Sequence, residues 1–222
     1  MISASGLVDH LQAQLEATYD VRSGIKVSEF LTDRRSVERL GGVVSAREEV
    51  FVVESAETGG VDLGLYLAPE LFERLRGKDP RHRSGLGLVT EELSAFSAMT
   101  EGVSHMLYLS RCAEAGRPVS KLELEVQAEI DKFAVSTLHL WGRGLREKAH
   151  ELWDRLFLQV RSRQGLTADE RDRYGTAGAL GGRYARHLIE EHVKPGRLDG
   201  FLRDLRAVYR LPLAEKLSAL AR

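Results

Sequence analysis

Cysteine is nearly absent from this sequence: Cys112 is the single thiol among 222 residues. One thiol excludes an internal disulfide and any zinc site built from several cysteines, and it favours a reduced compartment. Long apolar runs are also missing, since no stretch approaches the roughly 18 apolar residues of a membrane span. The N-terminus lacks the positive region and the continuous apolar segment of a signal peptide. We therefore expect a cytoplasmic protein that does not enter a membrane.

A surplus of charge of either sign is missing as well. The sequence has 32 lysine and arginine residues against 33 aspartate and glutamate residues, which gives a formal net charge of −1. Without a global basic field, nucleic acid is not expected as a partner. No serine stands in a Gly-x-Ser-x-Gly motif, and no Walker or dinucleotide-binding glycine pattern follows a predicted strand. No internal repeat is visible, which excludes solenoid folds.

The spacing of apolar residues predicts the fold class. Residues 6–19 place leucines on one face of an amphipathic helix, and residues 25–31 alternate as a strand does. Residues 49–54 and 61–67 are the clearest strands, and the glycines between them favour an antiparallel hairpin. Beyond residue 88 the apolar spacing is helical. The expected fold is therefore α+β, with a small antiparallel sheet near the N-terminus followed by a mainly helical bundle.

A basic, glycine-rich stretch over residues 77–87 predicts the position of a linker, since it combines one proline with three glycines. We expect the N-terminal helix and the small sheet in residues 1–77. A helical domain over residues 88–222 is expected to pack on them as one compact unit.

Local signals predict the starts of two later helices. Ser120 with Glu123, and Thr167 with Glu170, each form the pattern of a capping box. A run of small residues, 175–182, lies inside the second of these helices. Because glycine costs helix propensity, we interpret this run as a place of close contact with another helix.

A histidine pair, His187 and His192, lies near the end of the same helix. A spacing of five residues separates the two side chains by about 140° on an α-helix. Such a pair is a poor metal chelate, so we interpret both histidines as surface residues.

Metal-ligating side chains come together in the helix predicted over residues 90–112. Glu101 and His105 are four residues apart, so both side chains leave the same face of this helix. Apolar residues on the other face predict a helix that is buried on both sides. A carboxylate and an imidazole turned inward from a central helix form a candidate site. On the next predicted helix, Glu125 and Glu129 repeat the four-residue spacing.

This arrangement resembles the gluzincin, or thermolysin-like, metallopeptidases. In that family one helix carries His-Glu-x-x-His, and a following helix carries the third zinc ligand in a Glu-x-x-x-Asp pattern. Glu101 and His105 stand at the positions of the two histidines, and Glu125 follows His105 by 20 residues. The resemblance covers about residues 25–135. It implies a divalent metal, Zn, Fe or Mn, held by Glu101, His105 and Glu125, with Glu129 in the place of the second acid.

Gly102 departs from the family pattern, because it stands where the family has its catalytic glutamate. A glycine cannot act as general base, and the carboxylate of Glu101 favours harder cations than an imidazole does. The resemblance therefore implies a domain that binds a metal or a peptide-like ligand between two helices without the family's hydrolysis. Glu91 lies on the same helix face as Glu101, and with Glu129 it is expected to support the site.

Three other interpretations remain open. Glutamate and histidine at this spacing also form ordinary surface or salt-bridged pairs. The chain can be a helical adaptor or regulatory subunit without a catalytic site. It would then bind a protein partner or a second copy of itself through the small-residue helix and the C-terminal tail. It can also be an enzyme in which His105 works with Glu101 or Glu125 as an acid–base set.

Overall fold

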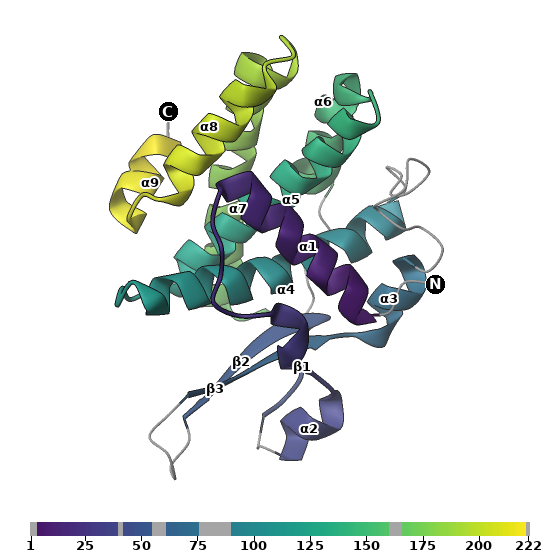
Figure 1. The fold of residues 1–222 in the computed structure, drawn as a ribbon, viewed down its shortest axis with the longest axis vertical. Helices are drawn as coiled ribbons and strands as arrows, with labels where there is room; N and C mark the ends of the chain where they lie inside the picture. Colours follow the sequence, from purple (N-terminus) through teal and green to yellow (C-terminus); the bar gives the residue numbers. More distant parts are fainter. Residues whose placement is uncertain (1–3, 40–41, 55–60, 76–89, 160–165, 221–222) are drawn as a thin grey trace. The chain divides into compact units, whose positions relative to one another are not determined.

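The computed structural model describes residues 4–39, 42–54, 61–75, 90–159 and 166–220. The chain forms two compact units, Met1–Ala13 with Ser23–Ala115 and Gln14–Arg22 with Gly116–Arg222. The strands and α-helices of Figure 1 are α1 (Ala4–Tyr19), β1 (Leu31–Thr32), α2 (Arg34–Arg39), β2 (Glu48–Glu54), β3 (Val61–Leu67), α3 (Pro69–Leu75), α4 (Thr90–Glu114), α5 (Lys121–Gly142), α6 (Ala149–Trp153), α7 (Ala168–Leu188), α8 (Leu198–Tyr209) and α9 (Leu213–Leu220). The predicted α+β class is confirmed, because a small sheet precedes a mainly helical remainder. The predicted linker over residues 77–87 lies outside the described residues, and a division of the chain there stays a prediction.

The first unit contains the β2–β3 hairpin. The two strands pair antiparallel, with Glu48 opposite Leu67 and Glu54 opposite Val61, which confirms the predicted hairpin. Strand β1 pairs with the other side of β3 in parallel, with Leu31 opposite Leu65. The sheet therefore has the order β1-β3-β2 and is mixed, whereas a purely antiparallel sheet was expected.

The strand predicted over residues 25–31 is mostly wrong. Residues Val27–Phe30 form a 3-10 helix, and only Leu31–Thr32 pair as a strand. The side chain of Gln12 explains the difference, because its Nε2 donates to Ile25 O at 2.8 Å and its Oε1 accepts from Val27 N at 2.8 Å. Gln12 thus satisfies backbone groups that a longer strand would have paired with a neighbouring strand. This contact comes from another helix, so the local alternation could not reveal it.

Gly102 sets how closely helix α4 approaches the sheet. A Cβ atom at this position would lie 3.0 Å from Leu65 Cδ1 and 3.1 Å from Leu67 Cδ2. Both leucines are buried, as is Val103, the next residue of α4. Because glycine has no side chain, the backbone of α4 can rest directly on the leucines of β3.

In the second unit, the small-residue run of α7 makes the close helix contact that the sequence predicts. A Cβ atom at Gly181 would lie 2.7 Å from Glu129 Cβ on α5. A Cβ atom at Gly182 would lie 3.2 Å from Phe157 Cγ in the π-helix η3 (Asp154–Leu158). Trp153 Nε1 also donates to Gly182 O at 2.6 Å. The glycines therefore let α7 pack tightly against its neighbours.

Two glycines of α7 are expected to respond in opposite ways to alanine. A Cβ atom at Gly178 meets nothing within 4 Å, so Gly178→Ala should stabilise the protein by about 0.5–1 kcal/mol through helix propensity. Gly181→Ala places its methyl group against Glu129 and should destabilise the protein by about 1–3 kcal/mol. Urea denaturation of both variants measures the difference. Equal effects at the two positions would contradict the close packing of α5 and α7.

Both predicted helix starts are confirmed, and a complete capping box forms only at the second. Glu123 N donates to Ser120 Oγ at 3.1 Å at the start of α5, while the Glu123 carboxylate pairs with Arg117 at 2.9 Å. At the start of α7, Thr167 and Glu170 form a complete capping box, with Thr167 N donating to Glu170 Oε2 at 2.8 Å.

A chain of buried polar side chains lies in the second unit. Lys216 of α9 is fully buried, and its Nζ donates to Gln127 Oε1 at 2.8 Å. Gln127 Nε2 donates to Asp131 Oδ1 at 2.8 Å, and the hydroxyl of Tyr19 donates to the same oxygen. Burial and then the Asp131 carboxylate raise the pKa of Tyr19 well above its ordinary value. The ring of Tyr19 stacks on Tyr209 with centroids 4.0 Å apart. Buried charges are stable only when hydrogen bonds compensate for the lost water, and this network supplies such bonds.

Candidate metal centre

Helix α4 presents Glu101 and His105 from successive turns. Glu101 is 7% exposed and His105 is half-buried. Ser104, between them, is buried as well. A carboxylate that loses this much water needs a compensating partner, whether a hydrogen-bond donor or a cation.

Glu125 lies in the second turn of α5 and is 9% exposed. The guanidinium of Arg173 on α7 lies near it, with Nε 3.7 Å from Glu125 Oε1. The distance exceeds that of a hydrogen bond, so the interaction is a loose ion pair. Arg173 also lies over the ring of Tyr174, with its Cζ 5.3 Å from the ring centroid.

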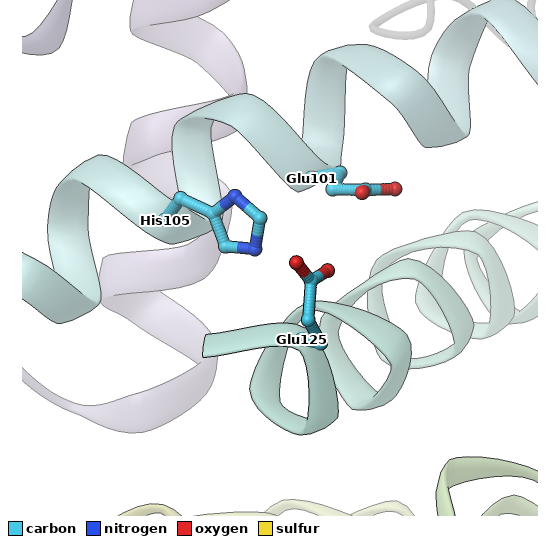
Figure 2. Close-up of side chains that lie close together, drawn as sticks. All are labelled: Glu101, His105 and Glu125. Atoms are coloured by element: carbon cyan, nitrogen blue, oxygen red, sulfur yellow. The ribbon is translucent and has the colours of Figure 1, made fainter. Parts of the chain in front are cut away.

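Glu101, His105 and Glu125 come together. Each offers one ligand atom, and these three atoms all lie within 4.8 Å of one another. Figure 2 shows the Glu125 carboxylate directed toward the His105 ring, with Glu101 beside them. Ligand atoms about 2.0–2.2 Å from a metal ion are at most about 4.4 Å apart, which is close to the 4.8 Å limit within which the three atoms lie.

The donor set fits the metals that the sequence suggested. Two carboxylate oxygens and one imidazole nitrogen suit Zn, Fe and Mn, because these ions accept both oxygen and nitrogen ligands. The described residues thus contain a buried glutamate–histidine–glutamate group that can hold a metal ion.

The two residues predicted to support this site lie in ion pairs elsewhere. Glu91 is on the surface, 76% exposed, and pairs with Arg74 at 2.7 Å. Glu129 pairs with Lys132 at 2.8 Å. The group of three contains neither of them. The sequence, in turn, did not point to Arg173, because its approach to Glu125 depends on the packing of α7 against α5.

The interpretation of both His187 and His192 as surface residues is wrong for His192. His187 is half-exposed, with 51% of its side chain accessible, but His192 has only 12% accessible. The helix does not continue as a regular α-helix, because residues Ile189–Val193 form the π-helix η4. The angle of about 140° between the histidines assumed α-helical geometry throughout.

Comparison with known proteins gives no match: no protein-family model, no curated protein and no solved structure is significantly similar to the chain. Within the described ranges, no helix combines the length and the apolar character that a membrane span needs.

Proposed function

We propose that this protein binds a divalent metal ion through Glu101, His105 and Glu125. The observation that carries the proposal is the convergence of these three ligand atoms within 4.8 Å, with both carboxylates largely removed from water. Two buried carboxylates close together repel each other and favour a bound cation.

The reaction that a bound metal could support depends on whether a neighbouring residue supplies a general base. We propose that the chain is a degenerate relative of the gluzincins, which binds a metal or a peptide-like ligand without hydrolysing peptides by the family mechanism. Gly102 supports the absence of peptide hydrolysis, because a glycine carries no general base. Any side chain at this position would meet Leu65 and Leu67. A bound metal would polarise an oxygen of a ligand as a Lewis acid.

Metal analysis of the purified chain tests the proposal. The protein should bind Zn²⁺, Mn²⁺ or Fe²⁺, and His105→Ala should lose one equivalent of metal. Elemental analysis and titration of the metal-stripped protein measure the stoichiometry. Binding should weaken on acidification, because protons compete for the imidazole and the carboxylates.

His150→Ala is the matched control, since this histidine lies on the surface of α6 and pairs with Glu190 at 3.2 Å. Glu91→Gln is the control for the acidic ligands, because Glu91 lies on the surface in its pair with Arg74. Both controls should bind metal as the wild type does. A wild-type protein that takes up no metal, or a His105→Ala variant with unchanged metal content, would refute the proposal. A metal-free protein that co-purifies with a partner would instead favour the adaptor interpretation.

A further inference from the structure

A second group of metal-ligating side chains lies where α7 ends and α8 begins. In the π-helix η4, hydrogen bonds run from each residue to the fifth along the chain, as in Lys194 N to Ile189 O at 2.9 Å. Beyond η4, in the turn that contains Gly196 with φ of 74°, Arg197 N donates to His192 O at 2.8 Å. The wider turn brings His192 beside His187, and their ring centroids are 6.4 Å apart. Single π-helical turns are frequent at functional sites.

Both histidines are directed at one oxygen of Asp204 on α8. Asp204 Oδ2 lies 2.8 Å from His192 Nε2 and 3.8 Å from His187 Nε2. Two imidazoles thus lie near one carboxylate oxygen of the adjacent helix α8. This is the donor set of many zinc and iron sites.

Gly200 fixes the position of the His192 ring. A Cβ atom at Gly200 would lie 2.6 Å from His192 Nδ1, so any other residue there would push the ring away. The absence of a side chain lets the ring lie against the backbone of α8 with Nε2 toward Asp204. The ring is therefore oriented before any ligand arrives.

Tyr184 gives an independent sign of a ligand. Its side chain is buried, and its hydroxyl has no hydrogen-bond partner among the residues that the structure describes. Its ring stacks on His187, with centroids 6.2 Å apart. Burial and then the Asp204 carboxylate raise the pKa of this hydroxyl, so it stays protonated and can donate a hydrogen bond. Buried polar groups in native proteins normally have a partner, and a ligand oxygen at the cluster would provide one.

We propose that His187, His192 and Asp204 form a binding site for a transition-metal ion of the zinc, nickel and copper class. In a tetrahedral zinc site, neighbouring ligand atoms are about 3.4 Å apart, so His192 and Asp204 are already close enough and His187 has to move toward them. The half-exposed His187 can close its gap by side-chain rotation. With two imidazoles, this site should prefer Ni²⁺, Cu²⁺ and Zn²⁺ over Mn²⁺, in contrast to the more oxygen-rich group around His105.

Zinc titration in the His105→Ala background tests this site separately from the proposed function. The His105→Ala protein, stripped of metal, should bind one equivalent of Zn²⁺ by isothermal titration calorimetry. His105→Ala/His187→Ala should bind at least about a hundredfold more weakly, which exceeds the usual cost of losing an outer-shell partner. His105→Ala/His150→Ala should bind as the background does, since His150 is a comparable surface histidine.

Gly200→Ala, in the same background, displaces the His192 ring while all three ligands remain. It should weaken zinc binding by about tenfold or more. Zinc should also shift the imidazole nitrogen resonances of both His187 and His192 in NMR spectra. If Gly200→Ala fails to fold, His187→Ala still tests the site, because the His187 side chain is half-exposed and its removal should leave the fold intact. Zinc binding that is absent in the His105→Ala background, or unchanged by His187→Ala, would overturn this inference without affecting the site at His105.

Discussion

Replacing Asp131 by alanine is expected to lower the free energy of unfolding by about 3–5 kcal/mol, the usual cost of breaking a buried charged pair or network. Asp131 is 2% exposed and accepts from both Gln127 and Tyr19. Without it, the Tyr19 hydroxyl loses its acceptor. The fully buried ammonium of Lys216 also loses the negative charge to which Gln127 connects it. Urea denaturation followed by circular dichroism measures the loss.

Two further variants separate this network from a general effect of the substitution. Asp131→Asn keeps an acceptor for Tyr19 and removes only the charge, so its effect should be smaller than that of Asp131→Ala. Asp172→Ala removes an exposed aspartate from α7 and should change stability by no more than about 0.5 kcal/mol. If Asp131→Ala lowered the free energy of unfolding as little as Asp172→Ala does, the buried network would not stabilise the protein as described.

Gly102→Glu, which introduces the glutamate that gluzincins carry, should destabilise the protein by more than about 4 kcal/mol instead of creating a peptidase. The new side chain would start 3.0 Å from Leu65 Cδ1 and 3.1 Å from Leu67 Cδ2. A carboxylate would then be forced between α4 and the buried leucines of β3, and next to the buried Glu48, whose Cβ would lie 3.5 Å from the new Cβ. Thermal and urea denaturation measure stability, and a peptide-cleavage assay measures activity.

The control for this substitution is Gly175→Glu on α7, where a Cβ atom meets nothing within 4 Å. It should be close to neutral or slightly stabilising, because glutamate favours a helix more than glycine does. Gly102→Ala should fall between the two, since the tips of leucine side chains can yield to one methyl group. A stable Gly102→Glu protein would show that α4 does not rest on β3 as described.

The helix starts could be predicted from sequence because capping is local. Ser120 and Thr167 bond to residues three positions away, so the pattern contains the whole interaction. The 3-10 helix at Val27–Phe30 was missed because Gln12, far away in sequence, binds the backbone there. The β2–β3 hairpin lies between these cases, since a short glycine-containing connection makes its pairing nearly local.

The two groups of metal ligands also differ in how far the sequence could predict them. Glu101 and His105 could be paired from sequence because a regular α-helix fixes their relative direction. Glu125 was suggested as the third ligand only by the resemblance to the gluzincins. The pairing of His187 with His192 was excluded by the same α-helical geometry. A π-helical turn is rare and has no reliable pattern in sequence, so the cluster with Asp204 became visible only in the structure.

The sheet order also bears on aggregation. Strand β2 lies at an edge of the described sheet, and Val52, next to its central residue, is 55% exposed. Such an edge offers backbone groups to which a second molecule could add a strand.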